Sequence, residues 1–182
     1  DIDLLKEMGK VTVSWSINTL DESFREDMGN AVSIERRLAA MEIFHRAGIR
    51  TTCFVSPIFP GITDVKAIIR RVKGQCNLIW LENLNLRGSY KTVIMDYIRE
   101  KYPQLYPLYH EIYNHNDRSY WIALDKELKA FAAEIGLDYV TNDDSMTRDF
   151  NAPPVIVNYF YHEQIKKSAR KGNGSHAGTA RS

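Results

Sequence analysis

The sequence predicts an α/β fold in which helices cross over between parallel strands. Apolar, strand-like segments at residues 10–17, 49–56 and 77–81 alternate with helix-like segments at 33–47 and 64–73. A strand–helix–strand order of this kind gives parallel strands with right-handed crossovers. Each strand is followed by a polar segment, namely SIN, SPIFPG or ENLNLRG. Since βα folds place their functional groups behind the strand ends, we expect a site there.

Composition places the chain among ordinary globular proteins and leaves nucleic acid a possible partner without support from charge. Its 182 residues, 44% of them hydrophobic, suffice for about one domain with a real core. The 24 basic and 23 acidic residues give a net charge of +1, so charge does not support nucleic acid as a partner. Apolar runs fall short of the about 20 residues of a membrane span. We therefore expect a cytoplasmic protein that has no membrane partner.

Two further features concern the cysteines and the start of the chain. Cys53 lies inside a predicted strand and Cys76 just before another, and we expect both to be buried free thiols. The sequence begins at Asp1, inside an αβ unit and without an initiator methionine. We expect it to be a piece of a longer protein.

The first strand separates apolar from polar side chains by parity. Its apolar face consists of Val11, Val13, Trp15 and Ile17, and its polar face of Thr12, Ser14, Ser16 and Asn18. In a βα repeat the apolar face packs under helices. The polar face must then look into a barrel lumen or cleft, and a lumen lined in this way suits a polar ligand.

The segment 33–47 is predicted to be an amphipathic helix that ends at Gly48. Its apolar stripe consists of Ile34, Leu38, Met41 and Phe44. On a helical wheel Arg37 falls on the inward side, whereas Arg36 points outward. A cation on a buried face needs a partner, so we expect one for Arg37. Upstream, Thr19 and Glu22 fit a capping box for a short helix at 20–25.

The chain is expected to comprise a βα part, a helical extension and a flexible tail, at residues 1–88, 89–170 and 171–182. Helical periodicity marks 90–102 and 119–135, and 137–141 is a possible short strand. The segment 153–161, PPVIVNYFY, is too apolar to be a free linker and must dock on the rest of the chain.

Aromatic and histidine side chains cluster in the extension. Helical spacing relates Tyr102, Tyr106, Tyr109 and Tyr113, a pattern that favours packing, although a lid or a hydrogen-atom relay is the alternative. His110 and His115 lie beside these tyrosines. Two histidines without a third ligand do not define a metal site, so none is predicted here.

Four segments resemble a known family: VSWSINTLDE, ERRLAAMEIFHRAGI, FVSPIFPGITD and LIWLENLNLRG. They are similar, in this order, to the C-terminal half of a radical S-adenosylmethionine (SAM) enzyme of the spore-photoproduct-lyase-like branch, also called DNA repair photolyase. The resemblance runs from Asp1 to about Gly88 and more weakly to about Lys167. It implies half of a (βα)6 partial TIM barrel with three to four parallel strands.

In that family a [4Fe–4S] cluster sits on a CxxxCxxC loop, and bound SAM is cleaved reductively to a 5′-deoxyadenosyl radical. This sequence has neither the cysteine loop nor the family's glycine-rich segment, and Cys53 and Cys76 cannot replace the loop. The resemblance therefore implies the SAM-binding part of an enzyme whose cluster ligands are not in this chain. We expect the chain to be inactive alone, with the missing N-terminal half of the barrel as its partner.

The resemblance also assigns cofactor-binding residues. Ser16 and Asn18 match positions that contact the ribose and methionyl part of SAM. Arg37 matches the helix arginine that pairs with the SAM carboxylate, a bidentate contact that lysine does not reproduce.

Two further segments match positions around the adenine. Ile58 and Phe59 match the loop whose backbone and apolar side chains line the adenine. Leu81, Glu82 and Asn83 match the strand end near the adenine edge. No catalytic residue and no metal ligand is assigned.

Each assignment has an alternative. Ser16 and Asn18 could cap the turn into the next helix, and Arg37 could pair with a strand carboxylate such as Glu82. Pro57 and Pro60 could simply end a strand.

Two other functions also remain open. One is a small βα metal-dependent enzyme that holds Mg²⁺ or Mn²⁺ with Asp64, Glu82, Asn83 and Asn85. The other is an inert fragment. Three parallel strands without their other half leave two open edges, so we expect a homo-oligomer in which these edges are covered.

Overall fold

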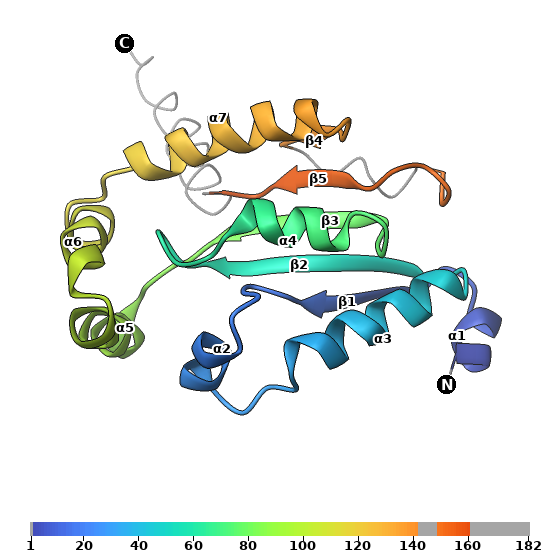
Figure 1. Ribbon diagram of the computed structural model, residues 1–182, viewed down its shortest axis with the longest axis horizontal. Coiled ribbons are helices and arrows are strands. Elements are labelled where there is room, and N and C mark those ends of the chain that lie inside the picture. Colours follow the sequence, from blue (N-terminus) through green and yellow to red (C-terminus); the bar gives the residue numbers. More distant parts are fainter. Residues whose placement is uncertain (1, 142–148, 161–182) are drawn as a thin grey trace, which may run out of the picture.

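The computed structural model describes residues 2–141 and 149–160, which contain a five-stranded parallel sheet (Figure 1). Its strands, in spatial order, are β1 (Thr12–Ser16), β2 (Arg50–Ile58), β3 (Leu78–Asn83), β5 (Val155–Asn158) and β4 (Tyr139–Val140). Each neighbouring pair is parallel. The predicted α/β class with crossover helices is confirmed, and the sheet is consistent with a partial TIM-barrel-like domain. The expected tail at 171–182 lies outside the described residues.

Helices cover one face of the sheet and the carboxyl ends of its strands. Their bounds are α1 (Ile2–Glu7), α2 (Glu22–Met28), α3 (Ile34–Arg46), α4 (Val65–Val72), α5 (Gly88–Lys101), η1 (Pro103–Leu105), α6 (Tyr106–Asn114) and α7 (Ser119–Glu134). Figure 1 shows α3, α4 and α7 along the sheet, with α2, α5 and α6 beyond the strand arrowheads. In the part of the chain that the structure describes, no helix is both long and apolar enough to cross a membrane.

Two hydrophobic cores result from this arrangement. The larger one lies between the sheet and α3, α4 and α7, and it includes Leu38, Val55, Ile68, Ile79, Trp121 and Ile156. The smaller one lies at the carboxyl ends of the strands, where Phe24, Phe59, Ile98 and Tyr109 meet. Tyr109 is fully buried, and Tyr102, Tyr106 and Tyr113 pack against the smaller core, as the packing interpretation of the tyrosines predicts.

The two faces of β1 behave as the parity of its side chains predicts. Val13 and Trp15 are half-buried, and the Trp15 ring meets Phe44 of α3 edge-on, with 5.2 Å between ring centroids. Thr12, Ser14 and Ser16 are exposed on the opposite face. The polar face of β1 is therefore turned away from the helices that cover the sheet.

Two local predictions are wrong. β2 does not end at Ser56 but runs through Pro57 to Ile58, because a register shift after Val55 accommodates the proline and the ladder resumes at Ile58 opposite Asn83. The Ser56–Pro57 peptide bond is cis. The N-cap of α2 is Asp21 rather than Thr19. The Asp21 carboxylate accepts hydrogen bonds from the backbone N–H groups of Ser23 and Phe24.

The edges of the sheet also differ from expectation. The described part of the apolar segment, residues 153–160, does dock as predicted, and its residues 155–158 form strand β5 beside β3. The expected open edge at β3 is therefore closed by this chain itself. Within the described residues, β1 forms one edge of the sheet and the two-residue strand β4 the other.

Both cysteines are buried free thiols, as predicted. Cys53 lies on β2 and Cys76 just before β3. Burial raises the pKa of Cys76 to about 12 and also raises the pKa of Cys53 well above its usual value. At neutral pH neither cysteine offers a thiolate to a metal.

Candidate functional site at the strand ends

Side-chain contacts connect the carboxyl ends of β1, β2 and β3. The Ser16 hydroxyl donates to the Ser56 carbonyl at 3.1 Å. The Ser56 hydroxyl in turn donates to Glu82 Oε2 at 2.8 Å. Three neighbouring strands therefore present hydroxyl and carboxylate groups in one continuous row. Such a row offers donors and acceptors to a polar ligand that lies across the strand ends.

Arg37 joins this row from the first turn of α3. Its Nη1 donates to the Ser16 carbonyl at 2.6 Å, whereas Nε and Nη2 are buried and have no hydrogen-bond partner among the described residues. The predicted inward direction is confirmed, and Arg36 is exposed as expected. Buried donors of a charged group are costly to leave unpaired. The free edge of the guanidinium is thus suited to bind an anion.

The charged neighbours of Arg37, Glu22 and Arg25, form hydrogen bonds with other partners. Burial lowers the pKa of the Arg37 guanidinium most, and Arg25 lowers it further, whereas the Glu22 carboxylate raises it. Glu22 Oε1 accepts a hydrogen bond from the Ile34 N–H at 2.6 Å, at the start of α3. The alternative pairing of Arg37 with Glu82 does not form among the described residues, because Glu82 binds Ser56.

The structure places three other candidate residues in the cores. Ile58 and Leu81 are fully buried in the larger core, and Phe59 is 1% exposed in the smaller core. A ligand at the strand ends can therefore meet their backbone but not their side chains. The apolar character of Ile58 and Phe59 is explained by their place in the protein interior, which both side chains fill.

The remaining polar candidates make local contacts. The Asn18 carbonyl accepts from Thr63 Oγ1 at 3.0 Å, and Asn83 Nδ2 donates to the Leu84 carbonyl at 3.3 Å. Asn83 and Asn85 line a small cavity, of about 80 Å³, next to α6 and α7. Asp64 caps α4 by accepting from the Ala67 N–H at 2.9 Å. Of the ligands of the alternative metal-dependent enzyme, Asp64 thus caps α4 and Glu82 binds Ser56.

Ser56 is the member of the row that sequence reasoning missed. It lies within the SPIFPG segment but was not singled out. The available signal was parity, because Phe54 and Ser56 share one face of β2 while Cys53 and Val55 share the buried face. Ser56 is therefore a polar residue of β2 on the same open face of the sheet as Ser16 of β1, and it belongs to the candidate site.

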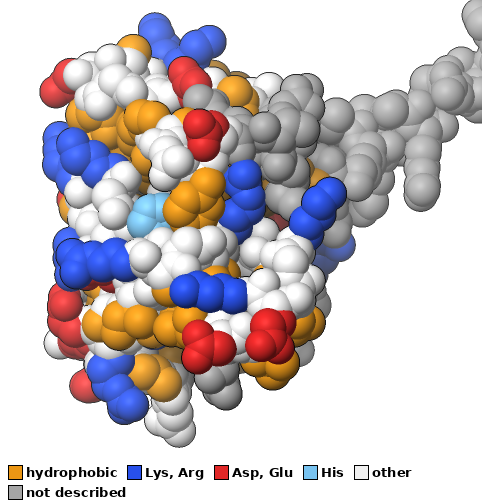
Figure 2. Space-filling view, turned by 90° about the vertical axis from the view of Figure 1, so that its right-hand side faces the viewer, with side chains coloured by type: hydrophobic (Ala, Val, Ile, Leu, Met, Phe, Trp, Pro, Cys, Tyr) orange, Lys and Arg blue, Asp and Glu red, His pale blue; other side chains and the backbone are white. Residues whose placement is uncertain are grey.

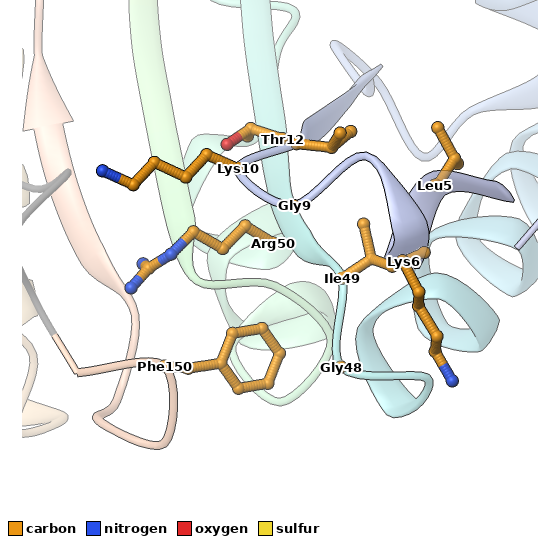
Figure 3. A pocket seen from close by; sticks show the side chains of 10 residues that line it. Leu5, Lys6, Gly9, Lys10, Thr12, Gly48, Ile49, Arg50 and Phe150 are labelled. Carbon is orange, nitrogen blue, oxygen red and sulfur yellow. The ribbon is translucent and has the colours of Figure 1, made fainter. Parts of the chain in front are cut away.

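A larger hollow lies at the opposite end of the sheet. Figure 2 shows this amino-end face, over which Lys and Arg side chains are spread among Asp and Glu. Its hollow, of about 630 Å³, is lined by α1, the start of β1 and β2, and Phe150. Figure 3 shows Lys10 and Arg50 extending in one direction, while Lys6 points away from them. The contacts of Ser16, Ser56, Glu82 and Arg37 place the candidate site at the other end.

Comparisons with known proteins bear on the class of the domain. Residues 1–72 match the family model described as the Radical SAM superfamily. The matched part extends from α1 through α4 and so includes β1, Arg37 and the SPIFPG segment. By this match and by its fold, the part of the chain at residues 1–72 is similar to a radical SAM domain.

One curated relative is a protein of Methanocaldococcus jannaschii described as uncharacterized. The two sequences are 31% identical over 109 residues, which is 59% of this chain and 41% of that protein. The chain therefore spans about two fifths of the length of the relative it matches. No solved structure matches the chain significantly.

Proposed function

We propose that this chain is the SAM-binding part of a radical SAM iron–sulfur enzyme. The family match over residues 1–72 and the parallel sheet support the class. The single observation that carries the proposal is the pair of buried Arg37 nitrogens at the carboxyl end of β1, for which residues 2–141 and 149–160 provide no hydrogen-bond partner. The methionyl carboxylate of SAM is an anion of the size and geometry that a guanidinium edge binds.

The candidate residues at the strand ends have proposed parts in binding. Arg37 Nε and Nη2 hold the carboxylate, while the bond from Nη1 to the Ser16 carbonyl fixes the plane of the guanidinium. Ser16 and Asn18 lie at the end of β1 and offer hydrogen bonds to the ribose, while Glu82 lies near the adenine edge. The backbone around Ile58, Phe59, Leu81 and Asn83 provides the contact for the adenine. Bound SAM supplies the group that the superfamily's reaction cleaves.

The iron–sulfur cluster does not fit the residues of this chain. The sequence contains two cysteines, Cys53 and Cys76, and burial keeps both as neutral thiols. A [4Fe–4S] cluster needs thiolate ligands, so we propose that it is held by residues outside this sequence. The chain's own residues then bind and orient SAM, and no catalytic residue is assigned to them.

The edge at β1 is the proposed contact for those other residues. β1 ends the described sheet with unpaired backbone groups, and such an edge pairs with a further strand. We propose that the other half of a barrel adds there, or a second copy of this chain when it stands alone. The spore-photoproduct-lyase-like branch stays a proposal that rests on the resemblance of the four segments.

The proposal is tested with two ligands that differ by one carboxylate. Isothermal titration calorimetry is carried out with SAM and with decarboxylated SAM, on the wild type and on Arg37→Ala. Hydrogen bonds to charged groups contribute about 1.5–3 kcal/mol. We therefore expect the wild type to bind SAM about 10–100-fold more tightly than decarboxylated SAM. Arg37→Ala should bind both ligands equally. Arg37→Lys should recover only part of the difference, because lysine cannot bind the carboxylate through two nitrogens.

Arg36→Ala is the matched control for this experiment. Arg36 is the neighbouring cation on α3 and points to solvent, so its removal should leave both affinities unchanged. If Arg37→Ala weakened the affinity for both ligands by the same factor, Arg37 would have a structural role only. Absence of SAM binding by the wild type would favour the inert fragment.

A further inference from the structure

Three potential metal ligands come together at the end of α6. The ligand atoms of His110, Glu111 and His115 all lie within 4.8 Å of one another. His115 Nδ1 is 2.9 Å from Glu111 Oε2, and the two imidazole rings meet edge-on at 4.9 Å between centroids. The side chains of Glu111 and His115 are 55% and 58% exposed, so an ion can reach them from solvent.

The end of the helix produces this cluster. On a regular helix His110 and His115 point about 140° apart, because successive residues turn by about 100°. Glu111 and His115 are four residues apart and share one side of the helix. At His115 the helix ends, and the chain turns at Asn116, whose φ is 56°. The backbone N–H groups of His115 and Asp117 both donate to the Glu111 carbonyl, at 3.2 and 3.1 Å, and hold this turn in place.

We propose that His110, Glu111 and His115 bind one divalent transition-metal ion of the zinc type. The proposal goes beyond SAM binding and does not depend on it, since no residue of this cluster belongs to the row at the strand ends. Two imidazoles and one carboxylate form a ligand set that zinc accepts with tetrahedral geometry. Magnesium and calcium prefer oxygen ligands and suit this cluster poorly.

The observed distances fit such an ion with small side-chain rotations. Bonds of about 2.0–2.1 Å from zinc to nitrogen or oxygen place two ligands of one ion roughly 3.3 Å apart. The separation of 2.9 Å between His115 and Glu111 is already close to this value. A hydrogen bond between His115 and Glu111 explains why these two side chains lie together. A bound metal ion would explain why all three side chains of the cluster do. Three protein ligands leave one coordination position for water or for a donor group of another molecule.

The test measures binding of Co²⁺ and Zn²⁺ to the purified chain after treatment with a chelator. Co²⁺ in a tetrahedral site with nitrogen and oxygen ligands gives a visible absorption, and Zn²⁺ should displace it. We expect one equivalent to saturate this signal. His110→Ala/His115→Ala should weaken binding at least 100-fold, because even the outer hydrogen-bond partners of metal ligands account for 10–100-fold.

Two further variants make the result specific. His45→Ala removes a histidine that stacks on Phe150, away from α6, and should leave the affinity unchanged. Glu111→Gln should weaken binding at least 10-fold and alter the Co²⁺ spectrum. Unchanged affinity in the double variant would overturn the proposal, and unchanged affinity in Glu111→Gln would overturn the three-ligand site. Circular dichroism checks that each variant remains folded.

Discussion

Replacing Trp121 by alanine is expected to lower the free energy of unfolding by about 3–5 kcal/mol. Trp121 lies on α7, is 1% exposed and belongs to the core between the helices and the sheet. Its ring contacts the rings of Tyr120 and Phe160, at centroid distances of 5.1 and 5.3 Å. Truncation leaves a cavity between α7 and the sheet that these neighbours cannot fill. Urea unfolding followed by circular dichroism measures the loss.

The adjacent residue provides the control for this prediction. Ile122 is on the same helix but is 65% exposed, so Ile122→Ala should change the free energy of unfolding by no more than about 0.5 kcal/mol. A loss below about 1 kcal/mol in Trp121→Ala would show that α7 does not pack on the sheet as described.

Phe59→Ala is expected to cost a similar amount, about 3–5 kcal/mol. The resemblance placed Phe59 against the adenine of SAM, whereas the structure buries its ring in the smaller core. There it meets Phe24 of α2 edge-on, with 5.0 Å between centroids. Because the side chain fills the interior, its removal should act on stability. Thermal and urea unfolding of the variant measure this effect.

A double-mutant cycle with Phe24→Ala separates the two accounts of Phe59. Aromatic pairs of this geometry couple by about 0.5–1.5 kcal/mol, so the two losses should not add. A Phe59→Ala protein with the stability of the wild type and a reduced affinity for SAM would support the adenine contact instead.

Local periodicity predicted the elements that position the site. The alternation of Trp15 and Ser16 identified the buried and open faces of β1. A helical wheel of residues 33–47 placed Arg37 on the inward side of the helix. Both depend on side chains close in sequence, whose directions follow from strand and helix geometry. The parallel order followed from the strand–helix alternation.

Other features depended on contacts between distant residues. The apolar character of 153–161 predicted burial, but only the fold shows that β5 pairs with β3. The family resemblance placed Ile58 and Phe59 beside the adenine, although a segment that follows a strand can turn its apolar side chains into a core. Pro57 was read as the end of β2, because a register shift cannot be seen in the sequence.

The cluster on α6 shows the same limit at short range. The sequence analysis found two histidines without a third ligand, and regular helical spacing would separate His110 from His115. The turn at the end of α6 brings the rings together, and Glu111 lies beside them as the proposed third ligand. Irregular helix ends are the places where side-chain spacing is least predictive.

The most direct test of SAM binding at the strand ends is a crystal structure of the chain with S-adenosylhomocysteine at saturating concentration. This ligand carries the same carboxylate as SAM and is chemically stable. Our account predicts its carboxylate about 2.7–2.9 Å from Nε and Nη2 of Arg37, with the ribose over Ser16. A ligand bound elsewhere, for example in the hollow at the amino end, with these two nitrogens still unpaired, would contradict the account.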